Sequence, residues 1–280
     1  MPGRLIVVPT PIGNLGDITA RALASLQEAD VVYAEDTRRS RALLQHFGIR
    51  KPLRSLFVGN EKEKSMLALG DLEVGRTVAL VSDAGTPGVS DPGAFLIQAA
   101  IAGGVRVEVL PGPQAILPAL LLSGLPPAPF TFVGFLPRAP QARRAALAEL
   151  TRTPWTLVFY EAPHRLGRTL ADMLDILGER PAAVVREISK LHEESRRGTL
   201  AELARWAQAE EVRGEVAVVV GGGAVLAVTR PDLPLADFVA RQLSLGETPA
   251  AIARAARDQG YPRREAYQEA LRQVGKSGED

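Results

Sequence analysis

Short apolar runs alternate with segments of helical periodicity along most of the chain. Residues 5–8, 31–34 and 77–81 are short, mostly apolar runs of strand length, and residues 105–110 (VRVEVL) are also expected to form a strand. In the segments between them, apolar residues recur every three or four positions, which is typical of the buried face of a helix. This alternation predicts a mainly parallel sheet that is covered by helices on both faces.

Polar residues between the apolar runs predict where the helices begin. Asp17 is expected to cap one helix, and a second helix is expected over residues 37–47. Asp91 and Pro92 have the sequence of an N-cap followed by the first helical position, where the missing N–H of proline is not needed. An apolar helix that ends near Ser123 completes this part of the chain.

A proline-rich stretch, LPPAP at residues 125–129, predicts a domain boundary. We therefore expect an N-terminal α/β domain over residues 1–124. Apolar runs at 130–135, 156–160, 182–188 and 215–220 predict a second α/β domain over residues 125–225, with helices near 141–150, 164–177 and 199–209. Because the connections vary in length, a mixed sheet is expected there.

The last part of the chain has a wholly helical pattern. Short helices at 235–245, 248–259 and 263–273, separated by glycine-containing turns, predict a small helical domain over residues 230–280 that resembles a helix-turn-helix arrangement. This tail either packs on the body as a cap or serves as an added binding module. Its eight basic and eight acidic residues do not decide between the two.

Composition narrows the class of protein. The chain has 280 residues, of which 46% are hydrophobic, and a formal net charge of +1. No apolar run reaches the ~18 residues of a membrane-spanning helix, and strand-like residues begin almost at once, so neither a membrane anchor nor a signal peptide is expected. There is no cysteine, and the three histidines lie far apart, so disulfides are excluded and no metal site is implied. A soluble cytoplasmic protein is expected.

The near-neutral total hides two basic clusters. Six basic residues and no acidic residue lie between Arg38 and Arg54. A second cluster contains Arg138, Arg143, Arg144 and Arg152. A solvated helix face explains either cluster alone, whereas two clusters beside candidate site loops favour a phosphate-rich partner.

The predicted strands end in rigid turns that carry polar residues. These turns are PTPIGN (9–14), EDTR (35–38), SDAGTP (82–87), PGPQA (111–115), YEAPHR (160–165) and REISK (186–190). Ligands of open α/β sheets bind beyond the carboxyl ends of the strands, so these turns form the candidate site. Neither GxGxxG nor GxxxxGK[ST] occurs among them. Backbone-lined, proline-stiffened loops suit a ligand such as S-adenosyl-L-methionine, although such turns also occur simply to end strands.

Seven segments carry a resemblance to a known family. They are LIVVPTPIGNLGDITARAL, AEDTRRSRALLQHFGI, LVSDAGTPGVSDPG, VLPGPQA, GFLPR, LVFYEAPHRL and REISKLHEE. In this order and spacing they resemble the tetrapyrrole-methylase-like (class III) methyltransferases, and within them the ribosomal RNA small subunit methyltransferase I family. The resemblance implies two α/β domains with the donor S-adenosyl-L-methionine in the cleft between them, plus a small helical C-terminal domain. It also implies a homodimer that 2′-O-methylates a cytidine of 16S rRNA near the decoding centre of the small ribosomal subunit.

The same resemblance implies which residues bind the donor, whereas the basic clusters supply most of the RNA candidates. The donor residues are Ile12, Asp83, Gly85, Thr86, Val89, Gln114, Ala115, Tyr160, Glu161 and Ala217. The RNA candidates, partly from the basic clusters, are Arg38, Arg39, Arg41, Asn60, Arg138, Arg143, Arg144, His164 and Arg165. Arginine contacts to phosphate would orient RNA without reading its sequence.

Methyl transfer to a ribose hydroxyl would gain about 10²–10⁴-fold in rate from a positioned base. The catalytic candidates at strand ends are Glu35, Asp36, Glu187 and Lys190, and Glu35 or Asp36 is preferred. Structural roles compete with this interpretation, because Asp36 can cap the following helix and Glu187 can pair with a nearby arginine.

One segment departs from the family pattern. Phe57, Val58 and Gly59 stand where a histidine-rich segment is expected, while Asn60 and Glu61 remain. Two other functions stay open: a tetrapyrrole C-methyltransferase of the same fold, and a non-catalytic RNA-binding factor of ribosome assembly.

Overall fold

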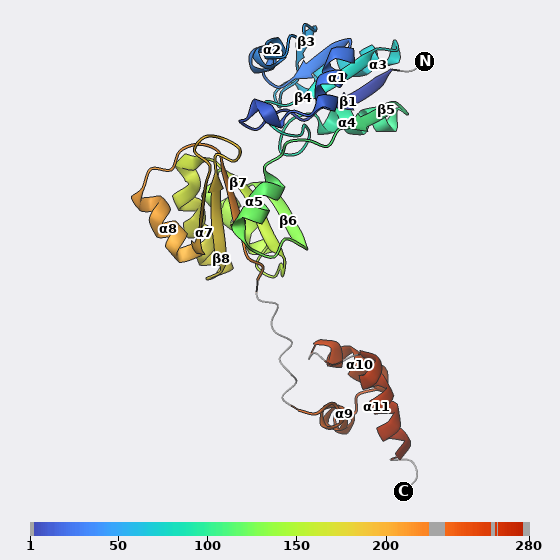
Figure 1. Ribbon diagram of the computed structural model, residues 1–280. Coiled ribbons are helices and arrows are strands. Elements are labelled where there is room, and N and C mark those ends of the chain that lie inside the picture. The colour runs from blue at the N-terminus through green and yellow to red at the C-terminus, as the bar shows by residue number, and fades with distance from the viewer. Residues whose placement is uncertain (1–2, 224–232, 259–260, 262, 277–280) are drawn as a thin grey trace. The chain divides into compact units, whose positions relative to one another are not determined.

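The computed structural model describes residues 3–223, 233–258, 261 and 263–276 (Figure 1). Residues 3–151 and 155–222 belong to one compact unit, and the C-terminal helices belong to a second. None of the described helices is long and apolar enough to cross a membrane.

The first sheet of the larger unit is parallel throughout, as expected. Its strands are β1 (Arg4–Val7), β2 (Val31–Ala34), β3 (Leu53–Ser55), β4 (Thr77–Val81) and β5 (Arg106–Val109). They lie in the order β3-β2-β4-β1-β5, and every pair is parallel. The edge strand β3, only three residues long and partly exposed, was not predicted.

Helices cover both faces of this sheet because successive strand residues point in opposite directions. The helices of this part are α1 (Ala20–Glu28), α2 (Thr37–His46), α3 (Glu61–Glu73) and α4 (Ala94–Ala102). On one face, Ile6 packs in a core with residues of α1 and α2. On the other, Leu5 and Val7 pack with residues of α3 and α4. The predicted helix-covered sheet is thus confirmed, although α3 was not predicted.

Two predicted helix starts are wrong. Asp17 lies in a short 3₁₀ turn, η1 (Leu15–Asp17), and Thr19 caps α1 by accepting from the Ala22 N–H at 3.0 Å. Helix α4 starts after Gly93, whose φ of +124° is a conformation that glycine adopts without strain. Asp91 is therefore not an N-cap but lies in the loop before the helix.

The second sheet is mixed, as expected. Its strands are β6 (Phe130–Phe135), β7 (Thr156–Glu161), β8 (Pro181–Arg186), β9 (Glu194–Thr199) and β10 (Val216–Val220). They lie in the order β6-β7-β10-β8-β9; β6 pairs with β7 in parallel and the other pairs are antiparallel. Strand β9, with the polar sequence ESRRGT, was not predicted.

The two faces of the second sheet are covered by helices from different parts of the chain. Helices α6 (Pro140–Glu149), α7 (Leu166–Leu177) and α8 (Leu200–Ala209) enclose a core on one face. Helix α5 (Ile116–Ser123) covers the other face through Ala119 and Leu120, although it precedes the LPPAP segment (Figure 1). The chain therefore crosses to the second sheet before the proline-rich stretch.

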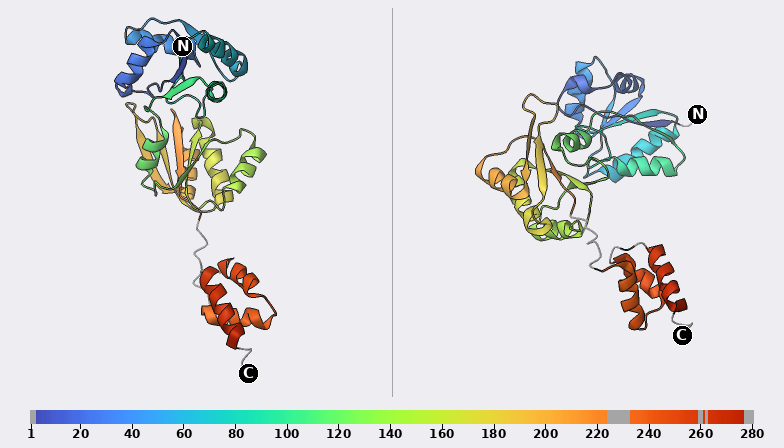
Figure 2. Two further views of the ribbon diagram at one scale, coloured as in Figure 1. Left: turned by 90° about the vertical axis from the view of Figure 1, so that its right-hand side faces the viewer. Right: turned by 60° about the horizontal axis from the view of Figure 1, so that its bottom comes forward.

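The C-terminal unit contains three helices among its described residues: α9 (Leu235–Ser244), α10 (Pro249–Asp258) and α11 (Arg263–Lys276) (Figure 2). They surround a small core in which the rings of Phe238 and Tyr261 lie 4.9 Å apart. The expected helical tail is confirmed as an element of structure with its own core.

A buried carboxylate in the first sheet domain is expected to be important for stability. Asp71 accepts hydrogen bonds from the Tyr33 hydroxyl at 2.8 Å and from Arg76 at 2.7 Å, and Arg54 also contacts it. Replacement by asparagine leaves these buried donors poorly matched, so D71N should lower the free energy of unfolding by about 2–4 kcal/mol in urea denaturation. D175N, at a carboxylate whose side chain is 64% exposed, is the control, and an equal loss in both variants would contradict the prediction.

Candidate active site

The main cavity of the larger unit has a volume of about 550 Å³. Its walls come from the loops after β1, β4, β5 and β7 and from β10. Most of the lining is apolar or backbone, with few charged side chains. Such a cavity, with a few convergent polar groups, is the usual form of a small-molecule site.

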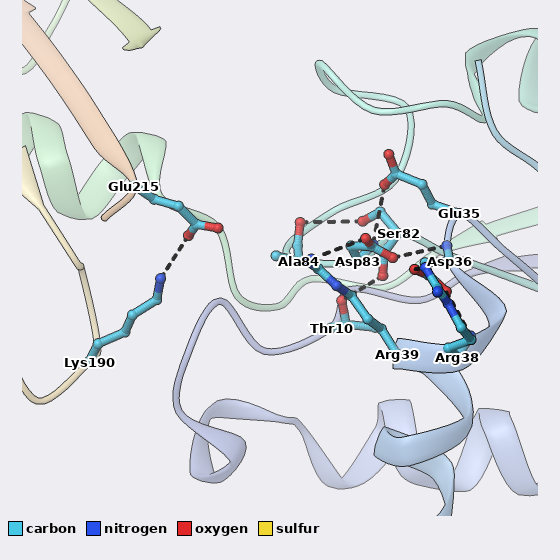
Figure 3. A network of polar contacts seen from close by, with 10 residues as sticks. All are labelled: Thr10, Glu35, Asp36, Arg38, Arg39, Ser82, Asp83, Ala84, Lys190 and Glu215. Atoms are coloured by element: carbon cyan, nitrogen blue, oxygen red, sulfur yellow. Dashed lines mark hydrogen bonds and ion pairs between the residues drawn. The ribbon is translucent and has the colours of Figure 1, made fainter. Parts of the chain in front are cut away.

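One wall is built on a short bridge between two loops. Thr10 and Gly85 exchange two backbone hydrogen bonds of 2.9 Å each. The Thr10 hydroxyl donates to the Ser82 carbonyl at 3.0 Å, which fixes the start of the SDAGTP loop (Figure 3). Gly85 has φ +82°, so a side chain here would strain the backbone. The bridge therefore holds the cavity-lining backbone in place.

Another part of the lining combines aromatic rings with the start of α5. The Tyr160 ring lies 5.0 Å from that of Phe132 and 5.5 Å from that of Phe135. The Gln114 side-chain oxygen accepts from the N–H groups of Ile116 and Leu117 at 3.0 and 3.3 Å, and so caps α5. Gln114 thus shapes the cavity through the helix that it caps.

Glu161 lines the cavity, but its carboxylate faces the protein. It accepts from the Thr169 hydroxyl at 2.6 Å and from the Ala162 N–H at 2.8 Å. Arg165 lies 3.3 Å from it and also donates to the carbonyls of Leu136 and Pro137. Glu161 and Arg165 therefore support this wall from behind, and Arg165 is engaged by protein groups.

A polar network lies where β2 and β4 end (Figure 3). The Asp83 carboxylate accepts from the Asp36 N–H at 3.0 Å and lies 3.2 Å from Arg39. The Asp83 N–H in turn approaches the Glu35 carboxylate at 3.4 Å. Burial raises the pKa of Glu35, while the Asp83 N–H acts in the opposite direction.

Asp36 has the geometry of a helix cap. Its carboxylate accepts from the Arg38 N–H at 2.8 Å, and the Arg38 guanidinium donates to it at 2.9 Å. The Arg38 side-chain and backbone hydrogen bonds lower the pKa of Asp36 to about 2. This carboxylate is therefore a weak base at neutral pH, which favours the capping role over the catalytic role.

Glu187 and Lys190 form an ion pair beside the cavity. Lys190 Nζ lies 3.0 Å from Glu187 and 3.0 Å from Glu215. Burial acts to raise the pKa of Glu187, but hydrogen bonds from the Glu215 N–H and Lys190 outweigh it and lower the pKa. Burial acts to lower the pKa of Lys190, but its two glutamates raise it. Glu187 and Lys190 are thus both stabilised in their charged forms. This favours a structural ion pair that holds the loop over a role in proton transfer.

Backbone strain is concentrated in this loop. Glu187 and Ser189 have φ values of +53° and +65°, which non-glycine residues rarely adopt. They flank Ile188, which lines the cavity. Such strain persists only where the surroundings hold it, and it is common at functional sites. A Cβ at Gly214 would lie 2.3 Å from the Glu187 carboxylate, so glycine permits this packing.

The donor residues implied by the resemblance mostly line the one cavity. Nine of the ten do so: Ile12, Gly85, Thr86, Val89, Gln114, Ala115, Tyr160, Glu161 and Ala217. The tenth, Asp83, instead lines an adjacent hollow of about 440 Å³ together with Arg39 and His46. Residues far apart in the sequence are thus brought together around one space.

The RNA candidates fall into two groups. Arg38, Arg39, Arg41, Arg138 and His164 are exposed, and Arg144 is partly exposed. Arg143 is only 5% exposed and pairs with Asp172 at 2.6 Å. Its assignment to RNA is corrected, because a guanidinium that is buried and already paired does not reach a phosphate. Asn60 accepts from the Phe57 N–H at 2.8 Å and so orders its own loop.

Sequence reasoning missed Asp91 as a cavity residue. It lines the cavity beside Ser90, which has φ +66°. Burial raises the pKa of Asp91 to about 6, and the carboxylates of Glu35, Asp83 and Glu215 add to the effect. The sequence Asp91-Pro92-Gly93 matched the pattern of a helix N-terminus. Asp91 was therefore predicted to be an N-cap and was not considered as a site residue.

The model for the Tetrapyrrole (Corrin/Porphyrin) Methylases family matches residues 4–204. The chain belongs to this family. The relatives of this methylase include "Ribosomal RNA small subunit methyltransferase I" of Halalkalibacterium halodurans, 45% identical over 95% of this chain and 93% of that protein. The protein of the same name from Escherichia coli O157:H7 is 42% identical over 98% of this chain and 96% of that protein. Within the tetrapyrrole methylases, the chain therefore belongs to the small subunit methyltransferase I family.

Solved structures resemble the methylase over its larger part. The uroporphyrin-III C-methyl transferase of Thermus thermophilus, complexed with S-adenyl homocysteine, matches with a TM-score of 0.54 and 27% identity, over 78% of this chain and 97% of that one. Diphthine synthase matches with a TM-score of 0.59 and 18% identity, over 78% and 90%, and shows the fold alone.

Proposed function

We propose that the protein transfers a methyl group from S-adenosyl-L-methionine to the 2′-hydroxyl of a cytidine in small-subunit rRNA, in the cytoplasm. The observation that carries this proposal is the 550 Å³ cavity lined by nine of the residues that the family resemblance assigns to the donor. The names of the relatives, at 42–45% identity over nearly the full chain, support rRNA as the acceptor.

The cavity residues fit this donor in shape and charge. Ile12, Val89 and Ile188 offer apolar surface to an adenosine, and Gly85 lets backbone approach closely. The described lining contains no lysine, arginine or histidine that would repel the positive sulfonium. S-adenosylmethionine supplies a methyl group on a sulfonium and leaves as a neutral thioether, with the carbon–sulfur bonding pair. The protein's own contribution is alignment, exclusion of water and removal of one proton from the acceptor.

Exposed arginines beside the site support an RNA acceptor. Arg38, Arg39 and Arg41 lie on α2, whose N-terminus follows the polar network of Figure 3. Phosphate contacts of this kind position the acceptor strand but do not select the base. Selection by the shape of an assembled ribosomal subunit is consistent with the few aromatic residues of the chain, 5% in all.

The decisive test is a choice of acceptor. Labelled S-adenosylmethionine is offered with small ribosomal subunits from cells that lack this protein, with naked 16S rRNA, and with a uroporphyrinogen. The proposal predicts label in rRNA as an alkali-resistant 2′-O-methylcytidine. Label in the tetrapyrrole alone would reassign the acceptor, and binding to subunits without any transfer would identify a non-catalytic assembly factor. The homodimer implied by the resemblance stays a prediction, which light scattering would test.

The exposed arginines of α2 are expected to control the salt dependence of RNA binding. Each phosphate contact that is lost reduces the slope of log K against log salt by about 0.7–0.9. R38A/R39A/R41A should therefore flatten the slope by about 2–3 in filter-binding titrations. The matched triple R168A/R205A/R213A removes exposed arginines from α7, α8 and the loop before β10. An equal flattening in the control would exclude a specific contact by α2.

A further inference from the structure

Among the residues that the structure describes, one carboxylate of the cavity lining, Asp91, has no cation within ion-pair distance. Among the described residues that line the cavity, the titratable side chains are Asp91, Tyr160, Glu161 and Glu215. Glu161 is 3% exposed and is held by Thr169 and its own loop. Glu215 lies at the rim, with its side chain 71% exposed, and pairs with Lys190.

Tyr160 is not suited to accept a proton. Burial and the nearby Asp91 carboxylate raise its pKa to about 12, so it remains a phenol at neutral pH. A phenol donates a hydrogen bond rather than taking up a proton. Asp91 is therefore the remaining proton acceptor in the described lining of the cavity.

The groups that face Asp91 come from four strands. Glu35 follows β2, Ser82 and Asp83 follow β4, Tyr160 belongs to β7, and Glu215 precedes β10. Three of these are carboxylates, which disfavour a further negative charge, and only the Ser82 hydroxyl acts in the opposite direction. Burial and these neighbours raise the pKa of Asp91 to about 6. A base with such a pKa is ionised at neutral pH but holds a proton more readily than an ordinary aspartate.

The loop around Asp91 is held in a fixed conformation. Ser90 has φ +66°, which is strained for a residue with a side chain. Three residues further on, Glu61 of α3 accepts from the N–H groups of Gly93 and Phe95 at 2.8 and 3.2 Å. The carboxylate is therefore positioned by backbone on both sides, which is what a catalytic group requires.

We propose that Asp91 is the base that takes the proton from the ribose hydroxyl during methyl transfer. The inference rests on the proposed function and names a residue that neither the family resemblance nor the strand-end motifs assigned. The hydroxyl oxygen forms the new bond to the methyl carbon as the carbon–sulfur bond breaks. The hydroxyl proton moves to a carboxylate oxygen of Asp91 and then to water, so charge and atoms balance.

The test combines kinetics, donor binding and stability of the D91N variant. Asparagine has nearly the same shape but cannot take up the proton. The expected result is a fall in kcat of about 10²–10⁴-fold, with donor affinity by calorimetry changed by less than about threefold. The wild-type kcat should rise with pH and reach a plateau above about pH 6. The kcat of D91N should not show this rise.

The stability of D91N provides a readout that is independent of activity. Because the folded pKa is raised above the ordinary 3.8, the ionised carboxylate destabilises the folded protein above about pH 6. The melting temperature of D91N should therefore exceed that of the wild type at pH 8. The difference should shrink as the pH falls from about 6 through 4 and vanish only about one unit below the ordinary pKa of 3.8, where the aspartate is protonated in both the folded and the unfolded protein.

Three outcomes would overturn the inference, and they are distinguishable. An unchanged kcat in D91N, while the wild type methylates rRNA, overturns the base role alone. A large loss of donor affinity with a normal single-turnover rate would make Asp91 a counter-ion of the donor instead. Absence of any transfer to rRNA by the wild type would overturn the proposed function and this inference together. E179Q changes an exposed carboxylate in the turn before β8, away from the cavity lining, and should match the wild type.

Discussion

Replacing Arg165 with alanine is expected to lower the free energy of unfolding by about 3–5 kcal/mol. Its guanidinium lies 3.3 Å from the Glu161 carboxylate, whose side chain is 1% exposed, and it donates to the carbonyls of Leu136 and Pro137. Without Arg165, a buried negative charge loses its cation and two carbonyls lose a donor. Most of the expected loss in the free energy of unfolding comes from leaving the buried Glu161 carboxylate without a compensating cation.

Circular dichroism melting measures this effect. With about 2–4 °C for each kcal/mol in a unit of this size, the melting temperature should fall by roughly 10 °C. R168A removes an exposed arginine one turn further along and is the matched control, with an expected change within about 0.5 kcal/mol. Adding E161Q to R165A should recover part of the loss, because a neutral amide costs less to bury. A loss that E161Q leaves unchanged would mean that the carbonyl contacts dominate.

Replacing Ala217 with leucine is expected to weaken donor binding by about 5- to 150-fold. Ala217 lies on β10, between Tyr160 of β7 and Val185 of β8, and lines the cavity while only 3% exposed. The larger side chain has no free space in the packed sheet, so it must extend into the cavity or strain it. A clash between the larger side chain and the bound donor, of the size known for overpacked cores at about 1–3 kcal/mol, corresponds to this range at 1.4 kcal/mol for each factor of ten.

Isothermal titration with S-adenosylmethionine measures the loss, and a melting curve checks that the fold is kept. A217S adds a single oxygen and should bind the donor within about threefold of the wild type. If A217L bound the donor normally while remaining folded, the donor would lie elsewhere than in this cavity. That result would also remove the main support for the proposed function.

Much of the architecture could be predicted from local sequence patterns. The apolar runs of β1, β2 and β4 are only four or five residues long, which is too short for a buried helix, and the residues between them have helical periodicity. Strands β3 and β9 could not be predicted, because each is an edge strand whose sequence, LRS and ESRRGT, has no apolar run. An edge strand gains its structure from pairing with a neighbour, and that information lies elsewhere in the chain.

The sequence could predict which loops surround the candidate site, because their position follows from the strands that they leave. Loops after parallel strands meet at one edge of a sheet, so the turns at 82–87 and 111–115 were correctly brought to one cavity. The roles of charged side chains could not be predicted in this way. Arg143 and Arg144 are adjacent in sequence, yet the helix turns Arg143 inward to Asp172 and leaves Arg144 partly exposed.

The sequence by itself determined the fold class, the family and the loops that surround the cavity, because those depend on periodicity and on motifs of adjacent residues. Only the tertiary structure decided how the candidate carboxylates are partnered and which of them line the cavity. Glu35 accepts from the Asp83 N–H and lies outside the described cavity lining. Asp36 is bound by Arg38 and Glu187 by Lys190, whereas Asp91 faces three carboxylates and no cation among the described residues. A carboxylate's pKa is set by burial and by charges brought near it through space, so it cannot be read from its neighbours in sequence.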